Sequence, residues 1–329
     1  MIDIENLSKE VAPLIDKEIE KVLPKNGMKN LNDAVWYHME TGGKKLRPLL
    51  AILTCEALGG SRDKILPFAA SCELLHNWFL VHDDIEDGDK VRRNKPSVWV
   101  EYGLAHGTNV GDYMAHKVFE LILTSKERDL EDKKIMSLLD AMVQTALSTA
   151  EGQTMDINLR GNNSPTEKDY LDMIIGKTAH YLTVPMIGAA VVADNEDLIP
   201  NLIEFGKNLG PAFQITDDIL DLTEGKGRNE IGRDIKEGKR SILVVHCLKK
   251  CSNEEKAKLL HILNKSPEET TDGDVAYAKD LFYKHGSVDY ARQMAEEFTS
   301  KAKHIADIFP QGLREILYFF ADYIIQRRK

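Results

Sequence analysis

Apolar residues recur at helical intervals along most of this 329-residue chain. Within each stretch they lie three or four positions apart, so that they share one face of an α-helix. Almost no segment alternates between apolar and polar residues in the manner of a strand. Helices are predicted at residues 4–22, 46–58, 65–85, 111–123, 135–159, 170–193, 198–222, 242–248, 254–263, 275–283, 288–309 and 313–327. The pattern therefore predicts an all-α fold.

Turn-forming residues separate the predicted helices. Breaks are expected at residues 59–61, along residues 160–166 and along the Gly/Lys/Arg-rich run 224–239. The segment from Ser164 to Glu167 carries the residue types of a capped helix start. None of these breaks is long or of low complexity, so no linker between independent domains is indicated. We expect residues 1–329 to form one large helical domain.

Charge and composition narrow the range of functions. The net charge is -10 at pH 7, whereas general nucleic-acid-binding proteins usually present a basic face to phosphate. An anionic ligand must therefore meet local cations, or metal ions held by the excess acid. The N-terminal residues mix charged and apolar positions, unlike a signal peptide. No apolar run reaches the roughly 20 residues that span a bilayer. We expect a cytoplasmic protein without a nucleic-acid partner or a membrane span.

Two acidic clusters share one pattern, in which an apolar helical stretch is followed by Asp-Asp-x-x-Asp. Residues three and four apart on a helix project to the same side, so each cluster gathers its carboxylates. Crowded carboxylates repel one another unless cations neutralise them. Hard oxygen ligands suit Mg²⁺, which shares its remaining positions with substrate phosphates. One such cluster could be a solvated helix end, but a matched pair predicts two metal sites. Their ligands are Asp83, Asp84 and Asp87 in the first, and Asp217, Asp218 and Asp221 in the second.

Cationic residues accompany both acidic clusters. Arg presents a planar fork to phosphate oxygens and Lys a compact charge, so both could receive a diphosphate. Taken singly, each is more typical of a solvated surface, but their regular placement favours phosphate binding. They are Lys44, Lys45 and Arg47 in a Gly-Gly-Lys-Lys-Leu-Arg-Pro segment, Arg92 and Arg93 after the first cluster, and Lys239 and Arg240 after the second.

With these motifs in this order, the chain resembles the trans-type polyprenyl synthases, the family that includes farnesyl and geranylgeranyl diphosphate synthases. The resemblance spans residues 42–242. It implies a helical bundle of the isoprenoid synthase type with a central active-site cavity, and a Mg²⁺-dependent prenyltransferase that forms a homodimer. The implied reaction joins isopentenyl diphosphate head-to-tail to an allylic diphosphate. Its products would be a short all-trans prenyl diphosphate, C15 or C20, and diphosphate.

The resemblance also implies roles for individual residues. The six aspartates would bind about three Mg²⁺ ions that clamp the allylic diphosphate between facing helices. Isopentenyl diphosphate would contact Lys44, Arg47, His76 and Arg93. The allylic diphosphate would contact Arg92, Lys177 and Lys239, with Thr178 and Gln214 lining the site of carbocation chemistry. A direct part in catalysis is expected of Asp83, Asp84, Asp87, Lys177, Gln214 and Asp217. The sequence departs from the family at Asn229, where a Lys is usual and which Arg228 or Lys226 could replace.

Two aromatic residues precede the first acidic cluster. Phe79 lies four residues before Asp83 and Trp78 five before it, about 6 Å further along the helix at ~1.5 Å per residue. Ordinary core packing would also explain such rings. In the family, residues at these positions are associated with blocked elongation, which implies a shallow pocket and a short product. Side chains of a neighbouring helix could also line that floor: Tyr113, Met114, His116 and Lys117.

Other functions are compatible with parts of this pattern. A longer-chain polyprenyl diphosphate synthase differs only in product length. A terpene cyclase shares the helical architecture, but its second metal motif normally mixes Asn/Asp, Ser/Thr and Glu. A squalene-type enzyme lacks the Gly-Gly-Lys-Lys-Leu-Arg-Pro segment. A non-catalytic partner subunit would be expected to have lost acidic residues, whereas all six aspartates are present.

Overall fold

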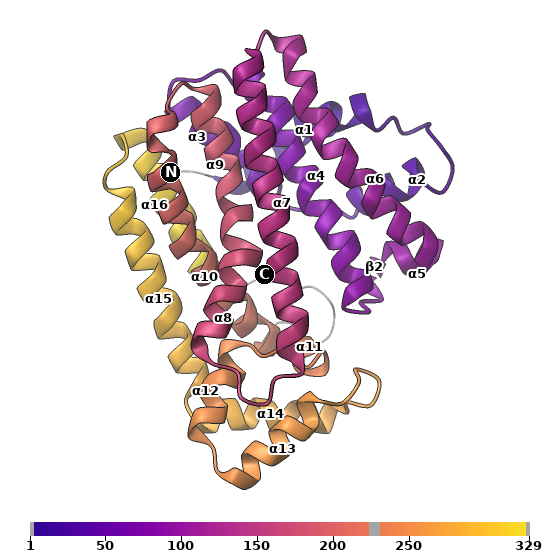
Figure 1. Cartoon of the computed structure of the whole chain (residues 1–329), viewed down its shortest axis with the longest axis vertical. Helices are drawn as coiled ribbons and strands as arrows, with labels where there is room; N and C mark the ends of the chain where they lie inside the picture. Colours follow the sequence, from indigo (N-terminus) through magenta and orange to yellow (C-terminus); the bar gives the residue numbers. More distant parts are fainter. Residues whose placement is uncertain (1–2, 224–230, 327–329) are drawn as a thin grey trace. The chain divides into compact units, whose positions relative to one another are not determined.

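A computed structural model describes residues 3–223 and 231–326 of the chain (Figure 1). Helices account for almost all regular structure in this part of the chain, which confirms the predicted all-α class. The described strands are β1 (Val91–Arg92) and β2 (Lys95–Pro96), which pair antiparallel in a short hairpin.

The helices follow the predicted ranges closely. In chain order they are α1 (Ile4–Val22), α2 (Asn32–Met39), α3 (Leu46–Ala57), α4 (Arg62–Glu86), α5 (Val98–Tyr102), α6 (Leu104–Leu123), η1 (Thr124–Arg128), α7 (Asp132–Arg160), α8 (Glu167–Ile174), η2 (Ile175–Ala179), α9 (His180–Val192), η3 (Glu196–Leu198), α10 (Ile199–Thr223), α11 (Arg233–Lys236), α12 (Ile242–Lys250), α13 (Asn253–Leu263), α14 (Asp272–Lys284), α15 (Ser287–Ala306) and α16 (Gln311–Gln326).

Several details of the sequence prediction were wrong, among them the start of α6, which lies at Leu104 and not at residue 111. The helices α2, α5 and α11 were missed, because four to eight residues are too few to show a clear apolar period. The helix expected at 170–193 is divided by η2, one turn of π-helix. The capped start lies two residues later than expected. Thr166, and not Ser164, is the cap, and it forms a reciprocal capping box with Asp169.

The described residues form two compact units, and the expected single domain stays a prediction. The first unit runs to Gln144 and also takes in Thr183–Leu202 and Phe309–Ile316. The second comprises Thr145–Leu182, Ile203–Ile308 and the described chain after Leu317. None of the described helices combines the length and apolarity that crossing a membrane requires.

The first unit is organised around α4. This helix packs against α1, α3 and α6, and every residue from Ile65 to Leu75 is buried. A helix that is buried on all sides forms the centre of its unit. Burial becomes partial from His76 onward, so the last three turns of α4 leave the tightly packed core. Those turns carry Trp78, Phe79 and the first acidic cluster.

The second unit has its own apolar core. Its fully buried side chains come mainly from α12, α13, α14 and α15, and include Leu259, Phe282 and Ala291. The helix α8 and the second half of α10 add Tyr170, Ile174 and Ile215 to the same cluster. This core fixes α10, whose last two turns carry the second acidic cluster.

Candidate active site

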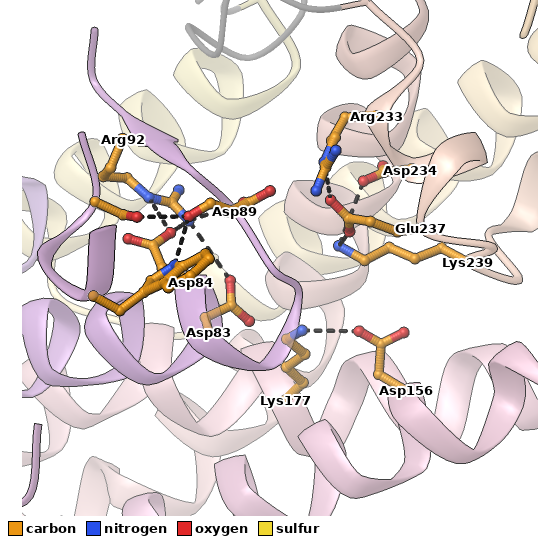
Figure 2. Close-up of polar contacts among 12 residues, drawn as sticks. Asp83, Asp84, Asp89, Arg92, Asp156, Lys177, Arg233, Asp234, Glu237 and Lys239 are labelled. Atoms are coloured by element: carbon orange, nitrogen blue, oxygen red, sulfur yellow. Dashed lines mark hydrogen bonds and ion pairs between the residues drawn. The ribbon is translucent and has the colours of Figure 1, made fainter. Parts of the chain in front are cut away.

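The first acidic cluster is held by an arginine from the neighbouring hairpin. Asp84 is fully buried, and Arg92 donates to its Oδ1 through Nε at 2.8 Å and again through Nη2. The same guanidinium lies 3.4 Å from Asp89 and 3.9 Å from Asp83 (Figure 2). Asp87 caps the end of α4. Arg92, expected to contact the allylic diphosphate, therefore lies against the predicted metal ligands of its own unit.

The carboxylate of Asp84 has the properties of a cation ligand. Burial raises its pKa to about 6, against the opposing effect of Arg92 and with a smaller contribution from Asp89. Its Oδ2 is buried and accepts no hydrogen bond from any described residue. Buried oxygen atoms without a hydrogen-bond partner are rare in proteins. A carboxylate oxygen is a hard ligand of the kind that Mg²⁺ prefers. The donor set of this cluster therefore fits the ion.

The hairpin joins the first cluster to the Gly-Gly-Lys-Lys loop. Its two turn residues, Arg93 and Asn94, have positive φ angles of 49° and 64°, as a two-residue hairpin turn requires. Arg92 thus reaches Asp84, while Arg93 donates through Nη1 to the Gly42 carbonyl and, at 3.3 Å, to Thr41 Oγ1. The sequence patterns did not predict this hairpin, because its strands have two residues each.

The loop before α3 separates two adjacent lysines. Lys45 is buried at a left-handed backbone position and forms ion pairs of 3.3 Å with Asp16 and Glu73. Lys44 is exposed. The suggestion that Lys45 could receive a diphosphate is therefore wrong, because its buried ammonium group already pairs with these two carboxylates.

His76 lies with the arginines that were predicted to bind the same substrate. Burial lowers its pKa well below the usual value, and the charges of Arg47 and Arg93 lower it further. The imidazole is therefore neutral near pH 7 and can still donate one hydrogen bond. Within the first unit, the structure brings together His76, Arg47 and Arg93, as the sequence predicted.

The second cluster is oriented by uncharged neighbours. Asp218 accepts from the Tyr170 hydroxyl at 2.7 Å through Oδ2 and from Gln214 Nε2 at 2.9 Å through Oδ1. Gln214 in turn accepts from the Thr178 hydroxyl at 3.4 Å. Asp221 accepts from the backbone amide of Asp234 at 3.1 Å. Gln214 and Thr178 were expected at this site, but Tyr170 was missed, because a lone Tyr in an amphipathic helix resembles a core residue.

The predicted phosphate-binding Lys177 lies in the π-helical turn η2. Its Nζ contacts the buried carboxylate of Asp156 on α7 at 2.9 Å (Figure 2). Burial alone would raise the pKa of Asp156, but Lys177 and Lys239 together hold it below the usual value. Asp156 was not predicted. It occupies a single acidic position on a long helix, and only its contact with Lys177 reveals a role.

Two glycines allow helices to approach this turn closely. A Cβ atom on Gly152 of α7 would lie 2.2 Å from the Lys177 amide nitrogen. A Cβ atom on Gly210 of α10 would lie 2.7 Å from the Ala179 Cα. Real Cβ atoms do not come so near to backbone, so η2 is confined between α7 and α10. π-Helical turns are frequently found at functional sites.

Lys239 belongs to a cluster of ion pairs around α11. Its Nζ lies 2.7 Å from Glu237 and 3.5 Å from Asp234, and Arg233 pairs with Glu237 at 2.8 Å (Figure 2). The adjacent Arg240 is almost completely buried. Its guanidinium donates to the backbone carbonyls of Asn162, Gly238 and Leu263 and to the Asn264 side chain. The suggestion that Arg240 receives a diphosphate is therefore wrong.

In the first unit the predicted Arg92 lies against the first acidic cluster, whereas in the second unit Lys177 pairs with Asp156, and Lys239 pairs with Asp234 and Glu237. No group of three His, Cys, Asp or Glu side chains in the described ranges is already arranged as a metal site. Asp84, Asp218 and Asp221 are instead oriented by the partners given above. Arg228, Lys226 and Asn229, named for one phosphate contact, lie outside the described residues. Trp78 and Phe79 are half-buried and stack on each other with ring centroids 4.7 Å apart.

Comparisons with known proteins define the class of enzyme. Residues 28–280 match the polyprenyl synthetase family. A geranylgeranyl diphosphate synthase of Saccharolobus solfataricus is 34% identical, with 93% of this chain and 92% of the relative covered. A short chain isoprenyl diphosphate synthase of Methanocaldococcus jannaschii is 35% identical, with 97% and 95% covered. The crystal structure of a geranylgeranyl pyrophosphate synthetase from Pyrococcus horikoshii has a TM-score of 0.89 at 33% identity, covering 98% of both chains.

These matches span nearly the whole chain, and they agree with the helical fold and the paired acidic clusters. The fold and site define a prenyltransferase of the isoprenoid synthase type. The chain belongs to the polyprenyl synthetase family, in its short-chain trans-prenyl branch. Magnesium dependence is general in this family.

Proposed function

We propose that this protein condenses isopentenyl diphosphate head-to-tail with an allylic diphosphate and releases a short all-trans prenyl diphosphate and diphosphate. The observation that carries this proposal is that each acidic cluster lies beside its own cations. Arg92 pairs with Asp84. Lys239 pairs with Asp234, whose backbone amide donates to Asp221 of the second cluster, and Lys177 pairs with Asp156. Two sets of carboxylates with matched cations suit a reaction that handles two diphosphates.

In the proposed chemistry, the carbon–oxygen bond of the allylic substrate breaks and its electron pair leaves with the diphosphate. The double bond of isopentenyl diphosphate then attacks the allylic cation, and a proton is lost. Bound Mg²⁺ would supply Lewis-acid stabilisation of the leaving charge, with Asp83, Asp84, Asp87, Asp217, Asp218 and Asp221 as its ligands. Arg92, Lys177 and Lys239 neutralise the departing diphosphate. Lys44, Arg47, His76 and Arg93 orient isopentenyl diphosphate.

Steady-state turnover with defined substrates tests this proposal. Purified protein with Mg²⁺, isopentenyl diphosphate and C5, C10 or C15 allylic primers should release diphosphate and yield a longer prenyl diphosphate. Asp84→Asn and Asp218→Asn should each lower kcat by about a hundredfold or more, because several kcal/mol of charge stabilisation are lost. Asp172→Asn, an exposed aspartate on α8, is the matched control and should leave kcat unchanged.

The same assay separates the alternative functions. A terpene cyclase would consume the allylic diphosphate without isopentenyl diphosphate, and a non-catalytic subunit would consume neither. Either result would overturn the proposal. Chelation of Mg²⁺ with EDTA should stop turnover, and added Mg²⁺ should restore it.

We propose that Trp78 and Phe79 end chain growth, giving C15 or C20 products. Relatives along the whole chain include a geranylgeranyl diphosphate synthase, named for a C20 product, and a geranylfarnesyl diphosphate synthase, named for a C25 product. The first of these supports a product in the proposed range. The stacked rings lie on α4, four and five residues before Asp83. Replacing both by Ala should lengthen the product, as measured by chromatography of the hydrolysed prenyl alcohols. An unchanged length would show that the stop lies elsewhere.

We also propose that the protein is a homodimer that associates through α7. Four large apolar side chains on the outward face of this helix are between 38% and 63% exposed: Met136, Val143, Leu147 and Ile157. Their spacing keeps them on one side of the helix, and an apolar stripe of this kind is typical of an association surface.

A further inference from the structure

A hydrogen-bonded link joins α4 to α6 just before the first acidic cluster. The indole Nε1–H of Trp78 donates to His82 Nδ1 at 3.3 Å. Because that nitrogen accepts, the proton of the neutral imidazole lies on Nε2. His82 Nε2 is 3.4 Å from the carbonyl oxygen of Thr108 and 3.5 Å from Asp112 Oδ1. His82 therefore connects an aromatic ring of α4 to the backbone and a carboxylate of α6.

A glycine on α6 makes room for the imidazole. Gly111 is buried, and a Cβ atom there would lie 2.1 Å from His82 Nε2 and 2.2 Å from its Cδ2. Even an alanine would therefore have to displace the ring. Packed interiors transmit such displacements, because they contain few voids that could absorb them.

The hydrogen bond decides how the indole is oriented. Trp78 is only half-buried, so neighbouring side chains do not enclose its ring on every side. One face stacks on Phe79 with an interplanar angle of 28°, and the edge contact with His82 has a centroid distance of 6.4 Å. Without an acceptor at His82, the indole could adopt other staggered rotamers at little cost.

We infer that His82, supported by Gly111, is a positioning residue that sets product length by holding the indole of Trp78. This inference rests on the proposed synthase function and on Trp78 as part of the stop. A fixed indole presents the same surface to every growing prenyl tail. An indole that turns aside allows a further isopentenyl unit to be added before the tail is blocked.

Product ratios in His82 variants test the inference. His82→Leu removes the acceptor and should raise the ratio of longer to shorter product about three- to tenfold, the range expected for one net hydrogen bond. His82→Asn should retain the wild-type ratio, because its side-chain oxygen can accept from the indole near the position of Nδ1. A purely structural role for His82 would lower the melting temperature or kcat without changing the ratio.

Two glycine variants on α6 provide a matched comparison. Gly111→Ala displaces the imidazole and should reproduce the ratio of His82→Leu. Gly107→Ala lies one helical turn away, where the new Cβ would meet Trp99 at 2.8 Å instead of His82. It should disturb α6 packing to a similar degree and leave the ratio at the wild-type value.

A double-mutant cycle completes the test. Trp78→Phe removes the donor and keeps an aromatic ring, and combined with His82→Leu it should add no further change, since both break the same bond. Trp78→Phe with Gly111→Ala gives the same answer if His82→Leu does not fold. If Trp78→Ala with Phe79→Ala lengthens the product but His82→Leu and Gly111→Ala leave the ratio unchanged, the inference is wrong. If the double Ala variant changes nothing, the proposed stop fails as well. Turnover of the wild-type protein with isopentenyl diphosphate and an allylic primer tests the synthase function independently of product length.

Discussion

Asp218 depends on two neighbours that carry no charge. Both of its oxygens are occupied, one by the Tyr170 hydroxyl and the other by the Gln214 amide. Burial, and then the negative charge of Asp218, raises the pKa of Tyr170 well above the usual value. The phenol therefore stays protonated and remains a donor near pH 7. Such partners orient a ligating carboxylate without touching the metal.

Removing this donor should weaken the second cluster. Tyr170→Phe leaves Asp218 with one hydrogen bond and should lower activity or apparent Mg²⁺ affinity about 10- to 100-fold. The measurement is a Mg²⁺ titration of initial rates. Tyr290→Phe is the control, because its hydroxyl donates at 2.7 Å to Glu167, which is not part of either cluster. An unchanged Mg²⁺ midpoint and kcat in Tyr170→Phe would contradict this role.

The roles of some individual residues could be predicted from the sequence, and those of others could not. The six aspartates could be predicted as groups, because helical spacing alone places them on one side. Lys44 and Lys45 could not be told apart, since only the left-handed backbone at Lys45 turns its side chain toward Asp16 and Glu73. Arg240 was misassigned for a similar reason. Two of the carbonyls that accept from its guanidinium, those of Asn162 and Leu263, lie 78 and 23 residues away in the chain.

At the scale of elements, the π-helical turn η2 depends on the helices that confine it. Gly152 of α7 lies directly against the Lys177 backbone, and Gly210 of α10 lies against Ala179. The apolar period of residues 170–193 predicted one continuous helix, because α9 is buried on nearly every side and has no polar face in which a shift of the period could be seen. The hairpin of β1 and β2 was missed because its strands are so short. Both missed elements hold predicted substrate-binding residues.

Gly152→Ala should destabilise the second unit. The new methyl would overlap the Lys177 amide, which is backbone and cannot rotate away, so a loss of about 1–3 kcal/mol is expected. Urea unfolding should show a lower midpoint, and the Michaelis constant for the allylic substrate should rise as Lys177 moves. Gly161→Ala follows the end of the same helix with open space around its Cβ, and should change neither quantity. Equal behaviour of the two variants would argue against the confinement of η2.

At the scale of the whole molecule, the fold class and the family could be predicted from the sequence, as could the approximate bounds of most long helices. The long helices bury wide apolar stripes, so their periods are visible in the sequence. The division into two compact units was not visible, because each unit is assembled from three separated segments of chain. The contacts that assemble them involve residues far apart in sequence, and local patterns do not record such contacts.

The exposed apolar side chains of α7 allow the oligomeric state of the protein to be tested. Met136→Glu combined with Leu147→Glu should convert the proposed dimer, twice 37.1 kDa, into a monomer, because charge on an apolar association surface is left unpaired and desolvated. Sedimentation velocity measures this change. Ser300→Glu adds an exposed charge on α15 and should leave the mass unchanged. Retention of the wild-type mass in the double Glu variant would place the contact elsewhere, and a monomeric wild type would rule the dimer out.

The π turn at Ile175–Ala179 acts as one extra residue in the path from α8 to α9. Deleting any one residue there would shorten the chain by less than 1% and could restore a regular α-helix. Everything downstream would then be rotated by about 100° relative to α8, and the side chains of α9, nearly all of which are buried, would lose their present packing contacts. The length of this segment is therefore under stronger constraint than most of its individual side chains, and homologous chains should vary here by substitution and not by deletion.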